Sequence, residues 1–359
     1  MVFIDPVLIM NSVTFASILS LLSLGITLSY MTTRVFNFAH TRFATLAAYA
    51  AATVMFAVAP RPQLTPQTMG GVVILVPMPW WWYLLGFVVA TIVGGIIAVV
   101  QFFAVLRPLQ ARGADYLTLM ISTLGFDFIL LAFLFIYSTM SQVRGLAAAS
   151  GLGTSPDRLT FSSYDIGISA GGIYYAGSFI EALIIAVAMV ILLGIMLTKT
   201  KIGIMMRASI ENPQLALVLG IDVNKVYALT WFLAGATAGI AGYLILFSTD
   251  TILSVYITPV TPSDNIIVSV FAGSIVGGVN SIFGSIGGGF LIGLVEQLLV
   301  PILATLVMFP DLTKYAKVFS MGAVALTLLF LPEGIASLGR TRWARSFMRI
   351  MGRRVEEVA

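Results

Sequence analysis

Three ionisable residues of this 359-residue chain stand inside long uncharged stretches: His40, Asp127 and Glu296. An ionisable side chain within an apolar segment is costly, and it usually faces a polar path or a buried partner. We expect Glu296 either to hydrogen-bond a glycine-rich turn or to contact a solute. Asp127 is expected to pair with a cation, to cap a broken helix or to serve the path. His40 is expected to hydrogen-bond backbone groups freed near Asn37, and Arg42 is interpreted as a residue at the membrane interface.

The residues of a catalytic or redox centre are absent from the sequence. The chain has no cysteine and one histidine, which excludes disulfides, thiolate metal sites, cysteine nucleophiles and His-rich metal sites. No Ser/His or paired-aspartate arrangement is visible, so an intramembrane enzyme is disfavoured. A G-x-x-x-x-G-K-[ST] phosphate loop is missing as well, so the chain cannot bind ATP in that way. We expect no metal and no cofactor.

Residues 199–225 form a polar segment between uncharged hydrophobic runs. Asn212-Pro213 predicts a helix start inside it, because proline suits the first helical turn. A charged, helix-forming segment of this length typically docks on a soluble partner, and the alternative is a loop held by lipid head groups. Its cationic residues are Lys199, Lys201, Arg207 and Lys225. The apolar face of the expected helix consists of Leu215, Ala216 and Leu219.

Residues 273–289 hold seven glycines in 17 positions. Such a stretch unwinds at membrane depth only where it is buried or lines a water-filled cavity, and transporters use broken helices to expose backbone groups to solutes. The GxxxG spacing of several pairs also fits close helix packing alone. The segment Asn37–Arg42 is the second polar interruption and a candidate counterpart in the other half of the fold. The candidate path residues of the two segments are Asn37, His40, Thr41, Gly277, Gly278, Asn280 and Ser281.

The composition sets the class of protein. Hydrophobic residues make up 59% of the chain and charged residues 9%, with a mean hydropathy of +1.03, whereas a soluble domain has about 25% charged residues. The chain is therefore an integral membrane protein, and uncharged stretches of about 20 residues mark its spans. We predict an all-α polytopic fold with about nine transmembrane helices, some of them broken or re-entrant. The predicted spans are residues 6–33, 43–60 (beginning near Asn37), 80–106, 116–138, 182–198, 226–249, two spans within 265–308 divided near Asn280, and 318–332.

The distribution of Lys and Arg predicts the orientation in the membrane. With the C-terminus in the cytoplasm, 14 of the 19 Lys and Arg residues, Arg42 among them, fall on the inner side and five on the outer side. We therefore expect the N-terminus outside. The first hydrophobic run lacks a basic leader and an A-x-A-like cleavage site, so it is interpreted as a retained span. This distribution also accounts for the net charge of +4 and the pI near 9.3 without nucleic acid.

The chain divides into one transmembrane domain and one short tail. Residues 1–335 form the predicted domain, which contains the 199–225 segment, and residues 336–359 form a basic cytoplasmic tail. The predicted outer loops, 61–79 and 139–175, are long. They either contact an extracytoplasmic partner or simply connect spans.

Six motifs follow one another along the chain. They are Asn37-Phe38-Ala39-His40; Arg107-Pro108-Leu109 with Ile121–Gly125; Gly203, Arg207-Ala208, Asn212-Pro213, Ala216 and Gly220-Ile221; Gly239–Gly242; Gly277-Gly278, Gly284, Gly288 and Glu296; and Pro332–Ile335. In this order they resemble the motifs of the permease subunits of branched-chain amino acid ABC transporters, a family that also includes urea and short-chain amide permeases. The chain departs from the family pattern at Thr41-Arg42, where glycine followed by glutamate or a small residue is usual, and at Asn280, where glycine is usual.

The resemblance implies an importer subunit without its own motor. Two separate ATPase subunits would supply energy, a second permease subunit (a related chain or a second copy) would pair with this one, and an extracytoplasmic binding protein would deliver the substrate. The implied function is import of branched-chain or other small amino acids through the cell membrane. The alternatives are a urea or short-chain amide permease, an ion-coupled secondary transporter and a passive channel. The ATPase-coupling residues implied by the resemblance are Gly203, Arg207, Ala208, Asn212, Pro213, Ala216 and Gly220.

Overall fold

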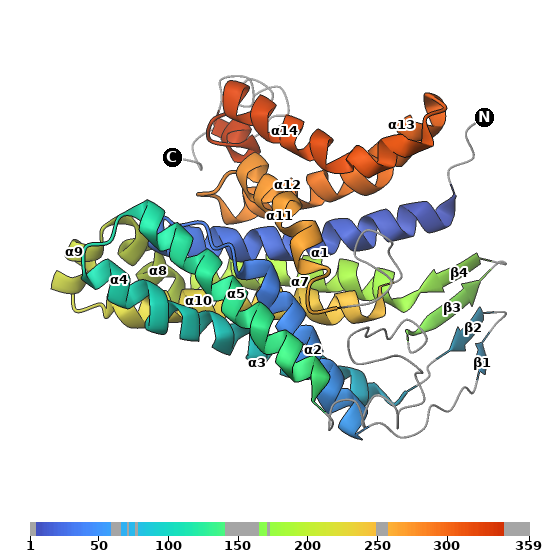
Figure 1. The fold of residues 1–359 in the computed structure, drawn as a ribbon, viewed down its shortest axis with the longest axis horizontal. Coiled ribbons are helices and arrows are strands. Elements are labelled where there is room, and N and C mark those ends of the chain that lie inside the picture. Colours follow the sequence, from blue (N-terminus) through green and yellow to red (C-terminus); the bar gives the residue numbers. More distant parts are fainter. Residues whose placement is uncertain are drawn as a thin grey trace.

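The computed structural model describes residues 5–58, 66–69, 72–75, 78–140, 165–170, 173–248 and 258–340, and helices dominate it (Figure 1). Its first part contains α1 (Pro6–Thr33), α2 (His40–Val58), β1 (Pro66–Met69), β2 (Val72–Leu75), α3 (Trp80–Gln101), the π-helix η1 (Phe102–Leu106), α4 (Arg107–Ala111) and α5 (Tyr116–Thr139). Then follow β3 (Gly167–Ala170), β4 (Ile173–Ala176), α7 (Gly177–Lys199), α8 (Lys201–Glu211), α9 (Pro213–Val218) and α10 (Val223–Phe247). The last part contains α11 (Ser263–Gly277), α12 (Ile282–Leu294), the π-helix η3 (Val295–Leu299), α13 (Val300–Leu306), the 3₁₀ helix η4 (Pro310–Tyr315), α14 (Ala316–Phe330) and the 3₁₀ helix η5 (Ile335–Arg340).

The described helices fit the predicted spans. Eight of them are long and apolar enough to cross a membrane, and α11 is a shorter apolar helix. The outer helices α3, α5, α7 and α14 carry large apolar side chains on their exposed faces, as expected for contact with lipid tails. Examples are Leu84, Phe128, Ile184 and Leu329. The prediction of an all-α polytopic membrane protein is confirmed.

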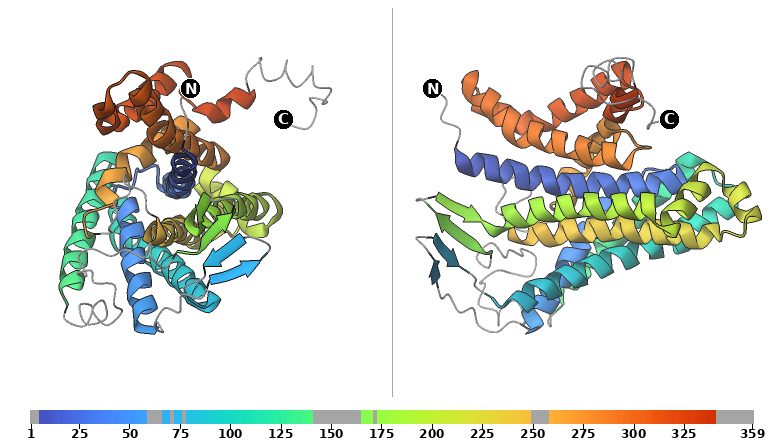
Figure 2. Two further views of the ribbon diagram at one scale, coloured as in Figure 1. Left: turned by 90° about the vertical axis from the view of Figure 1, so that its right-hand side faces the viewer. Right: turned by 180° about the vertical axis from the view of Figure 1, so that it is seen from behind.

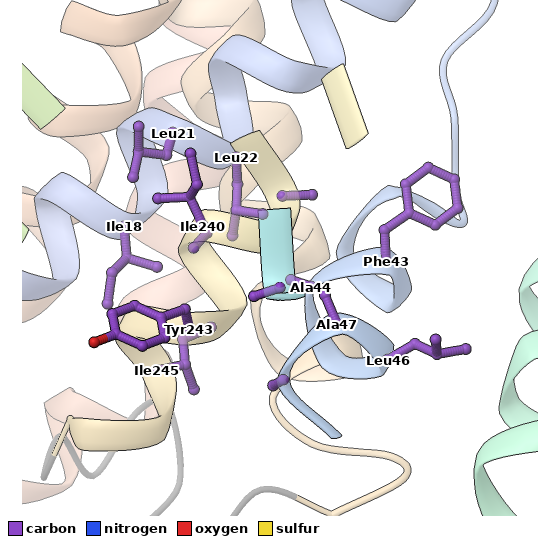
Figure 3. Close-up of a cluster of buried hydrophobic side chains, with 14 of the residues drawn as sticks. Ile18, Leu21, Leu22, Phe43, Ala44, Leu46, Ala47, Ile240, Tyr243 and Ile245 are labelled. Atoms are coloured by element: carbon purple, nitrogen blue, oxygen red, sulfur yellow. The ribbon is translucent and has the colours of Figure 1, made fainter. Parts of the chain in front are cut away.

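Helices α1 and α10 form the centre of the bundle, and Figure 2 shows both surrounded by other helices. Most of their residues are buried. Small residues let neighbours approach closely: a Cβ atom on Gly242 of α10 would lie 2.1 Å from the carbonyl oxygen of Ala44 in α2. Around this contact, apolar side chains of α1, α2 and α10 pack together, among them Ile18, Phe43 and Tyr243 (Figure 3). Close backbone packing of this kind is how helices associate inside a membrane.

Helix α2 begins inside the bundle. A Cβ atom on Gly25 would lie 2.5 Å from the imidazole of His40, the first residue of α2. Because α1 continues to Thr33, α2 starts about 12 Å short of the end of α1, and Figure 1 shows the connecting chain running back along the bundle. Helix α11 also starts inside. Ser23 and Thr27 of α1 hydrogen-bond Val270 and Ser274 of α11, so the two helices run parallel. The first residue of α11, Ser263, lies about 10 Å before Val270, beside the first half of α1 rather than at its end.

The predicted division near Asn280 is confirmed. Helix α11 ends at Gly277, and Gly278 has a φ of +108°, a conformation that favours glycine. Helix α12 then begins after Ser281, whose hydroxyl accepts a hydrogen bond from the backbone N–H of Gly284 at 3.1 Å. The uncharged run is therefore two antiparallel helices rather than one.

A four-stranded antiparallel sheet was absent from the sequence prediction. Its order is β1-β2-β3-β4, and Val73 of β2 lies opposite Ser169 of β3. The strands are short and their central pairing joins two segments far apart in the sequence, so no local pattern indicates it. The sheet lies at the end of the molecule opposite α8 and α9 (Figure 1). Most of the loops 61–79 and 139–175, and the tail beyond residue 340, lie outside the described residues.

Candidate functional site

A buried arginine occupies the place where α2, α5 and α11 meet. Arg42 is 1% exposed. Its Nε donates to Oδ1 of Asp127 at 2.9 Å and its Nη2 to Oδ2 at 3.1 Å. Nη2 also donates to Oδ1 of Asp264 at 2.5 Å. Nη1 donates to the carbonyls of Pro259 at 2.9 Å and Val260 at 3.2 Å. The five N–H groups of the guanidinium are therefore all engaged.

The interpretation of Arg42 as an interfacial residue is wrong. The side chain lies among helices, and two carboxylates offset the cost of burying its charge. The pairing expected for Asp127 with a cation is confirmed, and Arg42 is that cation. Sequence reasoning missed Asp264, although it is the last charged residue before the uncharged 265–295 run and stands in the first turn of α11.

Neighbouring side chains also hold together the place where α2, α5 and α11 meet, which we call the Arg42 junction. The hydroxyls of Thr41 and Ser263 lie 2.9 Å apart and share a hydrogen bond. Just before α2, the amides of Asn37 and Gln101 exchange two hydrogen bonds, of 2.9 and 3.0 Å. Asn37 also accepts from the backbone N–H of Ala39 at 3.1 Å. Two predicted path residues, Asn37 and Thr41, thus fix the start of α2, and Gln101 was not foreseen.

His40 is fully buried beside Gly25 and Thr237. Neither of its ring nitrogens has a hydrogen-bond partner among the described residues. Its backbone N–H donates to the carbonyl of Asn37 at 3.3 Å. The expectation that the imidazole binds the backbone freed near Asn37 is therefore wrong, and the side chain fills space where α1, α2 and α10 touch.

Glu296 belongs to the π-helix η3 and is 2% exposed. The hydroxyl of Ser269 on α11 donates to its two carboxylate oxygens at 2.8 and 2.9 Å, and Ser320 on α14 donates to Oε1. No described Lys or Arg forms an ion pair with it. The expected contact with a glycine-rich turn is wrong, because the partners are serines from two helices. Glu296 thus joins α12 to α11 and α14.

The glycine cluster is a contact between backbones. A Cβ atom on Gly277 would lie 2.1 Å from the carbonyl oxygen of Gly284, and one on Gly288 would lie 2.2 Å from that of Gly273. Helices α11 and α12 therefore touch along this line. Asn280 in the turn accepts a hydrogen bond from Arg34 Nη1 at 2.6 Å.

Five of the nine predicted path residues fall into two groups, while Gly277 and Gly278 belong to the contact between α11 and α12, and His40 and Glu296 lie apart from both groups. Asn37, Thr41 and Asp127 belong to the junction around Arg42. Asn280 and Ser281 line a cavity of about 230 Å³ that also contacts Arg207 of α8. The other residues around this cavity are Leu28, Met31, Leu197, Thr198, Met206, Ile210, Thr230, Ile282 and Phe283. The turn between α11 and α12 therefore lies beside the 199–225 segment.

The 199–225 segment forms two capped helices. The Thr200 hydroxyl accepts from the backbone N–H of Gly203 at 3.2 Å and starts α8. Asn212 accepts from the backbone N–H of Leu215 at 3.0 Å and starts α9, with Pro213 at its first position. The helix start predicted from Asn212-Pro213 is present. Hydrogen bonding to the backbone N–H of Lys225 lowers the pKa of Asp222, the cap of α10.

Glycines stand at both ends of the pair of helices α8 and α9, which we call the α8–α9 unit. A Cβ atom on Gly203 would lie 2.4 Å from the carbonyl oxygen of Leu197, so α8 packs tightly on the end of α7. Gly220 has a φ of +80°, and the next N–H, of Ile221, bonds back to the carbonyl of Ala216 at 3.0 Å. That left-handed residue and its bond are the usual end of a helix.

The tip of this unit is exposed and apolar. Ala216 is buried, whereas Val218 is 84% exposed. Arg207 is also exposed, and Ala208 is half-buried. The predicted apolar face is thus divided, since Ala216 packs inward while Leu215 and Leu219 point outward. The exposed apolar side chains of the tip are Leu215, Leu217, Val218 and Leu219.

Comparisons with known proteins identify the family. The family described as "Branched-chain amino acid transport system / permease component" matches residues 8–330. A probable branched-chain amino acid transport permease protein LivH from Methanocaldococcus jannaschii is 35% identical over 93% of this chain and 93% of its own length. The high-affinity branched-chain amino acid transport system permease protein LivH of Escherichia coli K12 is 25% identical over 92% of this chain and 94% of its own. The fructose import permease protein FruF of Bifidobacterium longum is 31% identical over 35% of this chain and 37% of its own. No solved structure is significantly similar to the chain.

The family match and the helices agree. The match runs from the first turn of α1 to the end of α14, and it therefore includes both the Arg42 junction and the capped α8–α9 unit. Members of this family are multi-pass membrane proteins that act as transport permeases rather than enzymes, and ATP is hydrolysed by partner subunits. This chain therefore belongs to the branched-chain amino acid permease family and is a permease subunit of an ABC importer.

Proposed function

We propose that this chain transports branched-chain amino acids through the cell membrane, and that ATPase subunits bound to the α8–α9 unit drive this transport. The observation that carries this proposal is the tip of α9, where four apolar side chains are exposed on a short capped helix. Apolar patches on a protein surface mark sites of interaction. The nearby Arg207 adds a positive charge that suits an acidic residue of the partner.

The partners follow from the two ends of the molecule. We propose two ATPase subunits and a second permease subunit, with the N-terminus outside and the C-terminus inside the cell. The ATPases would bind at the end formed by α4, α8 and α9. A substrate-binding protein would bind at the opposite end, beside the β1–β4 sheet (Figure 1).

The cavity beside Arg207 supplies a route for coupling. It separates α8 from Asn280 and Ser281 in the turn between α11 and α12. Movement of α8 by the ATPase subunits would close this cavity and displace the turn between α11 and α12. We assign Gly277 and Gly278 to the moving backbone contact, because they have no side chains to block a slide against α12 and the chain after α14.

The coupling test uses one substitution at two ends of the molecule. Val218→Asp places a charge on the exposed tip, and we expect the ATP hydrolysis stimulated by loaded binding protein to fall at least tenfold in the reconstituted importer. Val307→Asp is the comparison at the opposite end of the molecule, because Val307 is also exposed, at 65%, and follows α13. Since the binding protein would bind at that end, this variant is compared by the ATP hydrolysis of the importer without binding protein, which should be unchanged. Both variants should insert normally. Full stimulation in Val218→Asp would remove α9 from the ATPase contact.

The substrate test compares solutes in the same proteoliposomes. The relatives from M. jannaschii and E. coli are named as branched-chain amino acid permeases, so we expect ATP-dependent uptake of leucine. Uptake of urea instead would assign the chain to the amide permeases. Leucine uptake driven by a proton or sodium gradient without ATP would assign it to the secondary transporters.

A further inference from the structure

The charges around Arg42 do not balance. One guanidinium faces two carboxylates, Asp127 and Asp264, so the cluster holds one surplus negative charge. The two carboxylates are not equivalent. Asp127 uses both oxygens on Arg42, and its side chain is 11% exposed. Asp264 uses one oxygen, and its side chain is 49% exposed. The surplus charge therefore lies on Asp264.

The exposed side of Asp264 is a face of α11 that is not fully packed. Val268, Phe271 and Ile275 follow it at helical spacing, and all three are half-buried. The opposite face is buried against α1 and α12. A carboxylate at this depth would be costly against lipid tails, so such residues face a water-filled path or another protein surface. This stripe of α11 is therefore assigned to the path.

The geometry points to Arg42 and Asp264 as the contact site of the permease for a zwitterionic amino acid. This inference rests on the proposed function. The solute inserts between the two side chains: its carboxylate takes the place of Asp264 on Nη2 of Arg42, and its ammonium group pairs with the released Asp264. One cation and one anion enter together, so the charge of the junction does not change. Asp127 keeps the guanidinium in place throughout.

An apolar surface next to Asp264 can contact the aliphatic side chain of the solute. Phe271 lies seven residues along α11 from Asp264, which is about 10 Å. Phe38 packs edge-on against it, with ring centroids 5.2 Å apart. With Val268 they form an apolar surface on the same stripe as the carboxylate. An aliphatic side chain covers such a surface, whereas a neutral polar solute gains neither the ion pairs nor this contact.

In the absence of solute, the Arg42–Asp264 bond holds α2 and α11 together. Both helices start inside the bundle, and this bond joins their first turns together with the Thr41–Ser263 hydrogen bond. Replacing Asp264 on Arg42 by a solute carboxylate breaks the ion pair between the two helices and leaves the Thr41–Ser263 hydrogen bond as their remaining link at this point. Binding of the solute therefore loosens the contact between the first turns of α2 and α11.

The test is leucine uptake by the complete importer with its binding protein and ATPases in proteoliposomes. Asp264→Asn keeps an acceptor for Arg42 but removes the charge that binds the ammonium group. We expect the leucine transported per ATP hydrolysed to fall roughly tenfold or more, as for a lost charged hydrogen bond. ATP hydrolysis stimulated by loaded binding protein should stay within twofold of wild type. Asp311→Asn is the matched control, because Asp311 pairs with Lys314 on the surface, and its uptake should be unchanged.

Each other outcome overturns the assignment in a distinct way. Leucine transport by Asp264→Asn at the wild-type ratio would show that the solute does not use this carboxylate, and the proposed function would stand. Loss of stimulated ATP hydrolysis together with transport would make Asp264 a structural or coupling residue only. A wild-type importer that moves no amino acid would overturn the proposed function itself, and this site with it.

Discussion

Two stretches of the molecule, α3 to α5 and α12 to α14, share one backbone plan but carry different chemistry. Each has a long helix interrupted by a π-helix, η1 or η3, then a short helix, a tight turn and another span. Each follows a helix, α2 or α11, that begins inside the bundle. The comparison separates what the backbone requires from what the polar side chains add.

Proline sets the shared interruption. Pro108 stands six residues after the first residue of η1, and Pro301 stands six residues after the first residue of η3. Proline lacks an N–H and its ring displaces the carbonyl four residues earlier, which opens the helical ladder. In the second stretch that carbonyl belongs to Gln297, and it accepts a hydrogen bond from Ser12 at 3.0 Å.

The polar partners differ at matching positions. Asp127 and Ser320 each lie 19 residues after their proline (108 to 127, 301 to 320). Asp127 binds a buried arginine, whereas Ser320 donates to Glu296, which has serine partners. The first stretch therefore joins helices through charge and the second through hydroxyl groups. We expect these two junctions to respond very differently to the loss of a charge.

The largest effect is expected from Arg42→Met. The substitution leaves Asp127 buried without a counter-charge, and breaking a buried pair in this way costs about 3–5 kcal/mol in the free energy of unfolding. Adding Asp127→Leu should recover most of this loss, because an apolar pair of similar volume is often tolerated. The measurement is denaturant unfolding in mixed micelles. Arg34→Met, at an exposed arginine, should change stability by about 1 kcal/mol or less. A double variant less stable than Arg42→Met alone would contradict the pairing.

A smaller effect should distinguish the two carboxyl groups. Asp127→Asn removes the charge that Arg42 requires, and we expect a cost of about 2 kcal/mol. Glu296→Gln keeps a carbonyl acceptor for the serine hydroxyls, which can also rotate to accept from the amide. Its cost should therefore stay below about 1 kcal/mol, in the same unfolding measurement. Equal losses in the two variants would mean that Glu296 has a charged role like that of Asp127.

The sequence prediction succeeded where the interacting residues are close together in the sequence and failed where they are far apart. The spans, the division near Asn280 and the helix start at Pro213 are local signals, and all three were predictable. Arg42 was misinterpreted because its partners lie 85 and 222 residues further along the chain. An arginine beside a polar interruption looks the same in the sequence whether it faces lipid head groups or two distant carboxylates.

The expected correspondence between the Asn37–Arg42 segment and residues 273–289 is also wrong. By its place before an interrupted helix, α2 corresponds to α11, so the counterpart of Asn37–Arg42 is residues 258–264, which comprise the segment before α11 and its first two residues. Arg42 binds two carbonyls and the Asp264 carboxylate of that counterpart directly. The repeat is visible in backbone features and proline positions, whereas the side chains that a sequence comparison would match have diverged.

The smallest effect concerns the turns that end α4 and α13. Gly113 has a φ of +77° and Met308 a φ of +54°, and the following N–H bonds back to the helix in both turns, at 3.1 and 2.9 Å. A residue with a Cβ atom in this conformation is about 1–2 kcal/mol less stable than glycine. Gly113→Ala should therefore cost about 1 kcal/mol, because the new Cβ atom meets no other atom. Met308→Gly should gain at most about 1 kcal/mol, since Met308 is 90% exposed but glycine also adds freedom to the unfolded chain.

Paired unfolding measurements on these two variants test whether the turns are equivalent. A loss of stability in Gly113→Ala and a gain in Met308→Gly would show that both stretches end their interrupted helices with the same left-handed turn. Glycine suits this turn in the first stretch, and methionine does not in the second. A loss of stability in Met308→Gly would instead show that the freedom which glycine adds to the unfolded chain outweighs the relief of the left-handed backbone at this turn.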